Sequence, residues 1–158
     1  MDEGQLALAH AYRFLGRRDH SVAELRGKLV LRGYGAAAID QAIARLLELG
    51  YLDDRRFAMV WAGAAMRSGK GVGSRLRMEL QQRGVAADLI AETLSQLAQE
   101  HDERAVLAQL VARRYACFDP ISASVQERRR VYAYLQRRGF PLATILAFFS
   151  DHSGGERD

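Results

Sequence analysis

Apolar residues recur every three or four positions along most of the chain, which is the spacing of an amphipathic α-helix. The segment 6–18 shows this spacing clearly, and it returns in 54–67 and in 101–116. No segment shows the strict alternation of apolar and polar residues that is typical of a strand. The chain is rich in Ala, Leu, Arg, Glu and Gln, which are strong helix formers, and has only two prolines. The sequence therefore predicts an all-α fold.

One pattern, Leu-x-x-Arg-Gly-apolar with an Ile ten residues after the Leu, occurs three times. Its glycines are Gly33, Gly84 and Gly139, which lie 51 and 55 residues apart. The Arg suits the negative end of a helix, the Gly suits a left-handed backbone, and the apolar residue packs back on the helix just ended. Each copy therefore predicts a helix, a tight turn and a second helix whose Ile enters the core. Three copies at nearly even spacing indicate an internal repeat.

A further helix is expected before each copy, which gives three units of three helices. The predicted helices span 6–18, 21–32, 36–49, 54–67, 73–83, 86–99, 101–116, 122–138 and 141–150. The corresponding domains are 1–52, 53–99 and 100–150, followed by a flexible tail at 151–158. Because each unit is small for a stable core, the units are expected to stack in series as an elongated, curved, solenoid-like array.

Positive charge is carried almost entirely by arginine, with 21 Arg and two Lys in a chain of net charge +4. Arg forms bidentate contacts with phosphate or carboxylate, which favours a polyanionic partner, although a genome-wide preference for Arg would give the same composition. The second helix of each unit is basic, whereas the third helices are acidic or apolar. A helix-turn-helix protein needs donors on its last helix, so major-groove reading is disfavoured. The candidate residues for contact with a protein or DNA partner are Arg26, Lys28, Arg32, Arg67, Lys70, Arg75, Arg77, Arg130, Tyr134, Arg137 and Arg138.

The third unit has the clearest candidate surface. At about 100° per residue, Arg130, Tyr134, Arg137 and Arg138 share one face of the helix 122–138. An aromatic ring among arginines suits phosphate contact combined with base stacking. The alternative is a solvated surface on which Tyr134 packs against its neighbours.

Other chemistry is not supported by the sequence. The segment Gly63–Lys70 misses the spacing of a phosphate loop, and Gly71 stands where Ser or Thr is required. The four histidines and the single cysteine show no metal-ligand spacing. Cys117 is predicted to be buried and inert, and Asp53 and Asp54 are predicted to cap a helix rather than to act as acid and base. We therefore expect no catalytic residue, no metal and no cofactor, and the stretch 68–73 is expected to be a flexible basic loop.

Met1-Asp2-Glu3 is not the start that a signal peptide has, so none is expected. The sequence contains no apolar run of the roughly 20 residues that a membrane helix needs. We therefore expect a cytoplasmic protein without a membrane partner. A monomer is expected, although an odd number of units neither demands nor excludes a dimer.

The order of several motifs resembles the RecX regulatory protein family over about residues 8–150. The middle of the resemblance is Leu52-Asp53-Asp54-Arg55-Arg56-Phe57-Ala58, Trp61, a Gly-Lys-Gly loop and Leu80-Gln81-Gln82-Arg83-Gly84-Val85. Its flanks are Ser21-x-x-Glu24-Leu25-x-x-Lys28-Leu29 and Leu135-x-x-Arg138-Gly139-Phe140. The resemblance implies a non-enzymatic modulator, usually an inhibitor, of the RecA recombinase. It also implies binding to RecA and to its filament on single-stranded DNA, with suppression of ATP hydrolysis and strand exchange.

The resemblance and the repeated basic helices together suggest a mechanism. The three units would lie in the groove of the filament, and arginines of the second helices would contact filament acids, DNA phosphate or both. Two alternatives remain open at this stage. One is a regulator that binds duplex DNA, and the other is a general helical adaptor with no role at DNA.

Overall fold

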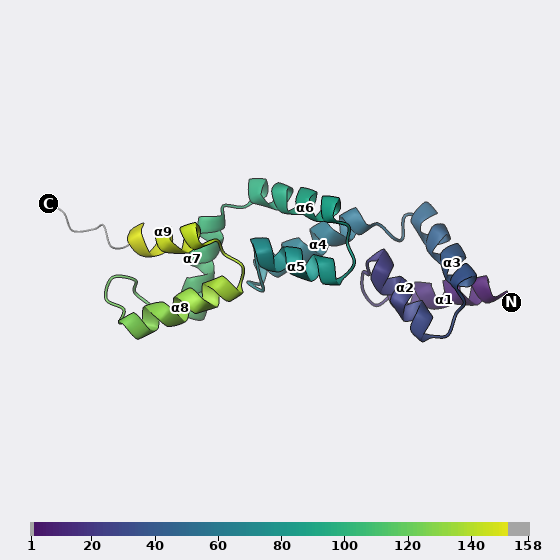
Figure 1. Cartoon of the computed structure of the whole chain (residues 1–158), viewed down its shortest axis with the longest axis horizontal. Helices are drawn as coiled ribbons and strands as arrows, with labels where there is room; N and C mark the ends of the chain where they lie inside the picture. The colour runs from purple at the N-terminus through teal and green to yellow at the C-terminus, as the bar shows by residue number, and fades with distance from the viewer. Residues whose placement is uncertain (1, 152–158) are drawn as a thin grey trace. The chain divides into compact units, whose positions relative to one another are not determined.

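Capping residues and glycine turns divide the chain into α-helices in the computed structural model, which describes residues 2–151. The helices are α1 (Glu3–Leu15), α2 (Val22–Leu31), α3 (Ala36–Glu48), α4 (Asp54–Arg67), α5 (Gly73–Gln82), α6 (Ala87–Glu100), α7 (Glu103–Arg114), α8 (Val125–Arg137) and α9 (Leu142–Asp151) (Figure 1). Within the described residues there is no strand, so the predicted all-α fold and the number of helices are confirmed.

Helix starts are fixed by local side-chain contacts. The predicted capping box of α2 is present, because Ser21 Oγ accepts from the Glu24 amide at 3.1 Å and Glu24 accepts from the Ser21 amide at 3.3 Å. Ser124 and Glu127 form the same box at the start of α8. The helix α8 therefore begins three residues later than predicted, since Ser124 ends the turn that Asp119 stabilises by accepting from the Ile121 amide.

Helix ends follow the repeated motif. Gly33, Gly84 and Gly139 have φ angles of 87°, 75° and 94°, the left-handed region that glycine tolerates best. After each glycine, the next amide donates to the carbonyl oxygen of the motif Leu, at 3.1–3.3 Å. The three Leu and three Ile side chains of the motif are at most 1% exposed. The predicted turn and the inward direction of the second helix are therefore confirmed.

The chain forms two compact units by its internal contacts. Unit 1 comprises residues 1–61 and 79–93, and unit 2 comprises residues 62–78 and 94–158. The boundaries between the units fall within α4, α5 and α6, so each of these helices contributes residues to both units. The predicted domain limits at 52 and 99 remain a prediction.

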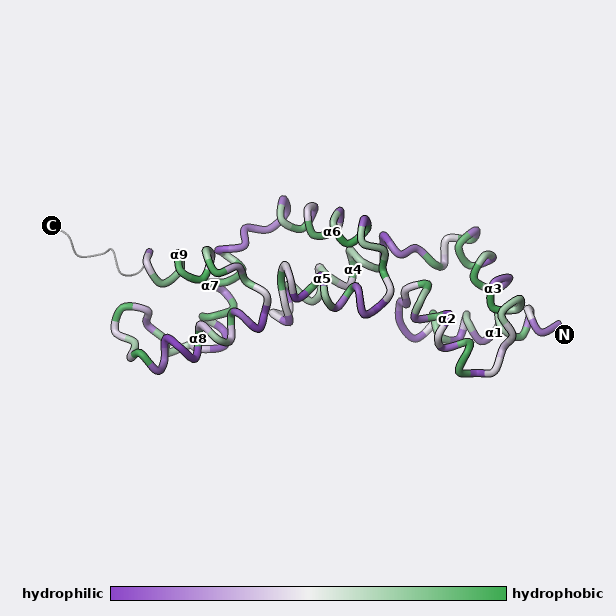
Figure 2. Tube along the Cα trace, viewed as in Figure 1, coloured by the Kyte–Doolittle hydropathy of each residue, from purple (hydrophilic) through white to green (hydrophobic). Residues whose placement is uncertain are grey.

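Each unit has its own hydrophobic core. Within unit 1, the first core cluster is Ala11, Leu25, Leu29, Ile39, Ile43, Leu46 and Leu52. Within unit 2, the core cluster is Val72, Leu107, Leu110, Val111, Val131, Tyr134, Leu135, Phe140 and Ile145. Figure 2 shows the hydropathy of each residue along the Cα trace, with long hydrophilic stretches on α8 between its apolar positions.

Two further features of residues 2–151 concern the C-terminal end of α9 and the hydropathy of the helices. Asp151, which was predicted to begin the tail, is the last residue of α9, and the rest of the predicted tail lies outside the described residues. Among residues 2–151, no helix has the length and hydropathy needed to cross a membrane.

Candidate anion-binding surface

In unit 2, the loop between α4 and α5 is bound to the end of α8. The Val72 amide donates to the carbonyl oxygen of Arg138 at 2.8 Å, and Arg138 Nη1 donates to the carbonyl oxygen of Lys70 at 3.1 Å. Gly71 and Val72 are buried in this contact. The stretch 68–73 was predicted to be a flexible loop, but its backbone is hydrogen-bonded to the turn that ends α8.

This close approach explains the glycines. Gly139 has a positive φ, and a Cβ there would overlap the carbonyl oxygen of Val72 and lie 2.7 Å from the Arg75 amide nitrogen. A Cβ at Gly71 would lie 2.6 Å from Arg75 Cγ. Gly139 therefore allows two backbones to pack together, and Gly71 leaves room for the Arg75 side chain, which accounts for Gly71 without a nucleotide.

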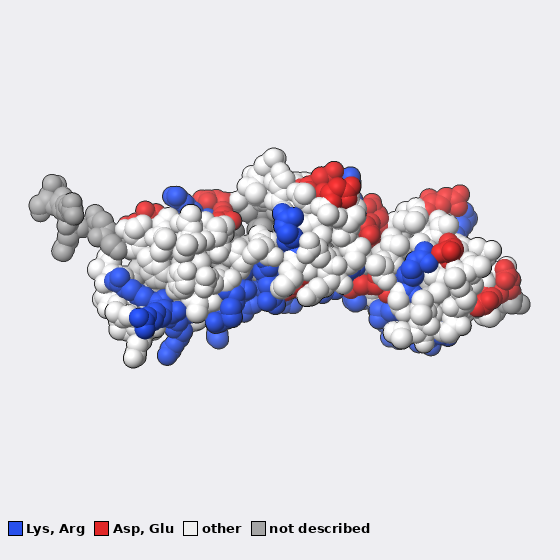
Figure 3. All heavy atoms as spheres, viewed as in Figure 1, with Lys and Arg blue, Asp and Glu red and all other residues white. Residues whose placement is uncertain are grey.

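The same contact gathers basic side chains from two segments that are far apart in the sequence. Arg67 and Lys70 are exposed on the α4–α5 segment, and Arg130 and Arg137 are exposed on α8. None of the four forms an ion pair with an acidic residue among residues 2–151. Figure 3 shows Lys and Arg side chains gathered over α8. We call these four residues the α8 basic surface.

Three further basic residues belong to the surroundings of this surface. Arg77 is exposed on α5, whereas Arg75 and Arg138 are half-buried. The guanidinium of Arg138 lies 5.0 Å from the centroid of the Tyr134 ring and is also bound to the Lys70 carbonyl, so it has a structural role in the turn. Arg113 was not predicted from the sequence, yet its Nη2 lies 2.7 Å from the position of a Cβ at Gly69. No local pattern could have revealed Arg113, because it reaches the loop from α7.

The placement of Tyr134 corrects the sequence interpretation. Tyr134 was expected to stand exposed among arginines, but it is 7% exposed and belongs to the core of unit 2. Its ring packs edge-to-face on Tyr115 at 5.4 Å, and Arg138 covers it. The physical reason is its helical spacing from Val131, which places both residues on the buried side of α8. Tyr134 therefore offers no platform for base stacking.

In unit 1, the predicted basic residues of α2 have partners of their own. Arg26 Nη1 donates to Asp40 at 2.6 Å. Lys28 Nζ and the Arg32 guanidinium lie 5.3 and 5.7 Å from the centroid of the Phe14 ring. Of these three, Arg26 is the one whose charge is neutralised by an acid.

Unit 1 contains a second contact of the kind made by Arg138. Here the turn that ends α5 lies on the start of α2, and Ser21 Oγ donates to the carbonyl oxygen of Arg83 at 2.5 Å. Arg83 Nη1 donates to Glu24 at 2.7 Å, and its guanidinium lies 4.6 Å from the centroid of the Trp61 ring. A Cβ at Gly84 would overlap Ala23 Cβ, so this turn also requires its glycine.

Two carboxylates at this contact, Glu24 and Asp54, have pKa values that are shifted in opposite directions. Burial alone would raise the pKa of Glu24, but hydrogen bonds and charges from Arg18, the Ser21 amide and Arg83 outweigh it, and the pKa is lowered. Burial raises the pKa of Asp54, although the Val22 amide donates to it at 2.8 Å. Asp54 was predicted to cap its own helix, and it binds the start of α2 instead. Asp53 caps as predicted, because it accepts from the Arg56 amide at 3.0 Å.

The placement of Cys117 corrects a further prediction. Cys117 was predicted to be buried, but it is exposed in the turn before α8. In this turn it is the neighbouring Phe118 that packs against the core of unit 2, and Cys117 is left in contact with solvent. Among residues 2–151, no group of three His, Cys, Asp or Glu side chains could hold a metal ion.

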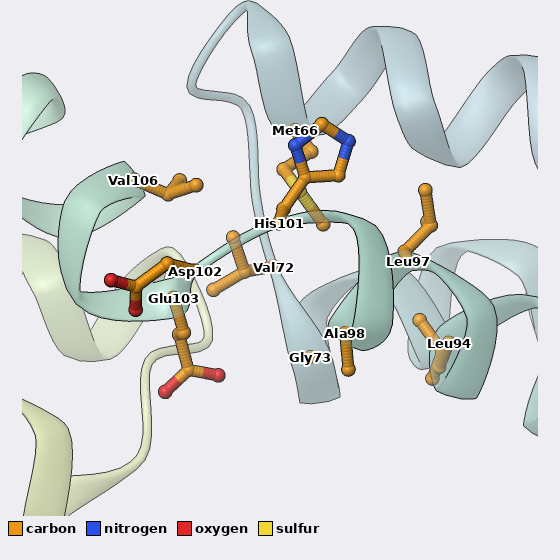
Figure 4. A pocket seen from close by; sticks show the side chains of 10 residues that line it. All are labelled: Met66, Val72, Gly73, Leu94, Leu97, Ala98, His101, Asp102, Glu103 and Val106. Carbon is orange, nitrogen blue, oxygen red and sulfur yellow. The ribbon is translucent and has the colours of Figure 1, made fainter.

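Unit 2 also contains an apolar cavity of about 210 Å³ (Figure 4). Leu94, Leu97 and Ala98 of α6 line one part of it, and Val72 lies near its centre in the close-up. Asp102 and Glu103 stand at its α7 end, and their carboxylates do not favour an anionic occupant. Asp102 accepts from the Arg104 amide at 3.0 Å and Glu103 accepts from Thr144 at 2.6 Å, so both have structural roles.

The fold and the basic surfaces define an all-α protein built from repeated three-helix domains. Three family models match the chain in order: the first three-helix domain of RecX at residues 7–46, the second at 53–94 and the third at 102–149. The chain belongs to the RecX family.

Relatives that are named regulatory protein RecX support the assignment. The chain is 42% identical over 139 residues to the protein of Trichlorobacter lovleyi, covering 88% of this chain and 90% of that one. It is 34% identical over 145 residues to the protein of Syntrophotalea carbinolica, covering 92% and 95%. The crystal structure of RecX from Lactobacillus salivarius is similar in fold, with a TM-score of 0.74 over 96% of this chain and 97% of that chain at 18% identity. The relatives are thus named as regulatory proteins rather than as enzymes.

Proposed function

We propose that this chain regulates the RecA recombinase by binding its filament on single-stranded DNA and slowing its ATPase and recombinase activities. Membership of the RecX family supports the regulatory role. The observation that carries the proposal is the α8 basic surface, in which the segment of Arg67 and Lys70 is joined to the end of α8 by two hydrogen bonds. One is donated by the Val72 amide to the Arg138 carbonyl oxygen, and the other by the Arg138 side chain to the Lys70 carbonyl oxygen. The proposed place of action is the cytoplasm, and the regulation needs no cofactor.

The α8 basic surface suits a polyanionic assembly. Arginines bind carboxylate or phosphate oxygens in a bidentate manner, and exposed cations that form no ion pair keep that capacity. Because Tyr134 is buried, contacts from this surface are to charged groups rather than to stacked bases. In the proposed mechanism, the surface contacts acids of the filament, DNA phosphate or both within the filament groove, and so hinders turnover of the filament.

Co-sedimentation with RecA tests the proposal. The chain should sediment with RecA filaments formed on single-stranded DNA, and it should sediment less with the same DNA alone. Contacts to phosphate should weaken steeply as salt is raised. Binding to a duplex of defined sequence in the absence of RecA would favour the duplex-binding alternative. Absence from the filament pellet under all conditions would contradict the proposal and favour a general adaptor.

A further inference from the structure

Unit 1 contains a second basic site that lies on α1 and that the α8 basic surface does not include. A cavity of about 120 Å³ is lined by His10, Arg13, Phe14, Arg17 and Arg32. The first four have the spacing i, i+3, i+4 and i+7, which places them on one side of α1 and its following turn. No Asp or Glu lines the cavity.

The cations of this cavity are not neutralised within the described chain. The three arginines that line the cavity, Arg13, Arg17 and Arg32, form no ion pair with an acidic residue among residues 2–151. By contrast, the neighbouring Arg18 binds Glu24 at 3.1 Å, so acids are available in this unit and are used elsewhere. The cavity therefore keeps a concentrated positive charge that an anion would relieve.

Helix-end electrostatics explain only part of this cluster. Arg13 lies in the last turn of α1 and Arg32 is the C-cap of α2, where a single cation contributes to stability by its interaction with the negative end of the helix dipole. That contribution does not require the two guanidiniums to converge on one cavity, where they repel each other. Two contacts also fix the position of the residues that line the cavity. His10 Nδ1 is hydrogen-bonded to the Tyr34 hydroxyl, and Phe14 packs on the core of unit 1.

The surroundings of the cavity distinguish a protein ligand from a nucleic acid. Leu31 is 88% exposed and lies one helical turn after Lys28 on α2. Burial of apolar side chains beside a basic pocket is a feature of protein interfaces. Lys28 and Arg32 lie against the Phe14 ring, so this ring is not an open platform for base stacking. The small cavity fits one anionic group rather than a continuous phosphate track.

We propose that His10, Arg13, Arg17 and Arg32 form a docking pocket for a carboxylate of an acidic protein segment whose neighbouring apolar side chain packs on Leu31. The site lies in unit 1 and uses residues outside the α8 basic surface, so it goes beyond the proposed regulation of RecA. It can fail while the proposed function holds, and the reverse is also true.

Fluorescence anisotropy with short labelled probes tests the pocket. The full chain is titrated with a 12-residue peptide of alternating Asp and Leu, a 12-residue peptide of alternating Asp and Ser, and a single-stranded oligothymidylate of equal charge. The Asp–Leu peptide should bind more tightly than the Asp–Ser peptide, because only the former covers Leu31. The double variant Arg13→Ala/Arg17→Ala should weaken the Asp–Leu peptide about tenfold, and Leu31→Ser should remove its advantage over the Asp–Ser peptide.

A charge-matched variant serves as the control. Arg45→Ala/Arg55→Ala removes two exposed arginines that pair with Glu48 and Glu92, outside the pocket, and should leave peptide affinity within twofold. Equal weakening by both double variants would show a net-charge effect and overturn the pocket. A larger loss for the oligothymidylate than for the peptide in Arg13→Ala/Arg17→Ala would assign the site to nucleic acid and overturn the proposed ligand.

Discussion

The Val72 amide donates a 2.8 Å hydrogen bond to the carbonyl oxygen of Arg138, although the two residues are 66 positions apart. This bond joins the end of α8 to the start of α5. The corresponding contact in unit 1 joins the Arg83 carbonyl at the end of α5 to Ser21 at the start of α2. The second and third copies of the Arg-Gly turn thus do more than end a helix, because each also docks on the start of the second helix of the preceding repeat.

The docking role of the turn predicts a large penalty for Gly139→Ala. The alanine would adopt a left-handed backbone at a cost of about 1–2 kcal/mol, and its Cβ would overlap the Val72 carbonyl oxygen. We expect the free energy of unfolding to fall by at least about 2 kcal/mol in urea denaturation. Gly27→Ala is the matched control, because Gly27 is inside α2 with nothing within 4 Å of its Cβ position. It should stabilise the chain by about 0.5–1 kcal/mol, and a similar loss in both variants would contradict the docking role.

The environment of Glu24 predicts a pH-dependent loss in Glu24→Gln. Glutamine keeps the capping box, so the variant removes mainly the charge that faces Arg18 and Arg83. Since the folded chain lowers the pKa of Glu24, its contribution is complete above the ordinary value of 4.5 and is lost as the pH falls through the folded value. The expected destabilisation is about 2–3 kcal/mol at pH 7 and decreases as the pH falls below 4.5.

Denaturation of Glu24→Gln at several pH values measures this effect. Glu48→Gln is the control, because Glu48 and its partner Arg45 are both exposed and their pair should contribute less than about 1 kcal/mol. A Glu24→Gln penalty that stays constant from pH 7 to pH 3 would show that the lowered pKa does not stabilise the fold.

The burial of Tyr134 predicts a structural rather than a binding phenotype. Tyr134→Ala should lower the free energy of unfolding by about 3–5 kcal/mol, because it empties part of the unit 2 core. Tyr134→Phe keeps the ring against Tyr115 and should leave both stability and filament binding near those of the unchanged chain. A folded Tyr134→Phe variant with strongly reduced filament binding would show that the hydroxyl contacts the partner.

The exposure of Cys117 predicts ready modification of the native chain. A thiol-specific reagent added without denaturant should label one cysteine per chain at a rate close to that of a small model thiol, since Cys117 is exposed. Mass spectrometry of the intact chain measures the extent of labelling. Labelling that requires denaturant would restore the earlier prediction of a buried thiol.

Local patterns predicted the helices well. The capping box at Ser21 and the Leu-x-x-Arg-Gly turns act over a few residues, so their sequence signals are complete within one window. The start of α8 was misplaced because the turn after Asp119 is stabilised by hydrogen bonds that do not require helix periodicity.

Contacts between distant segments were not visible in the sequence. The glycines around Lys70 were predicted to make a flexible loop. Instead, this segment is hydrogen-bonded to Arg138 in the turn after α8, which lies 68 residues away in the sequence. Tyr134 was grouped with arginines on its own helix, although its spacing from Val131 and Leu135 is equally helical and marks the buried side. Helical periodicity alone cannot decide which arc of an arginine-rich helix faces the core, because long side chains can occupy the boundary of either arc.

The ATPase rate of RecA on single-stranded DNA is the measurement that tests the regulatory role of the α8 basic surface most directly. The unchanged chain should slow the rate, and Arg130→Ala/Arg137→Ala should lose most of this effect while its urea midpoint stays unchanged, since both side chains are exposed. The variant Arg45→Ala/Arg55→Ala should inhibit as well as the unchanged chain. Undiminished inhibition by Arg130→Ala/Arg137→Ala, or no effect of the unchanged chain on the rate, would contradict the account.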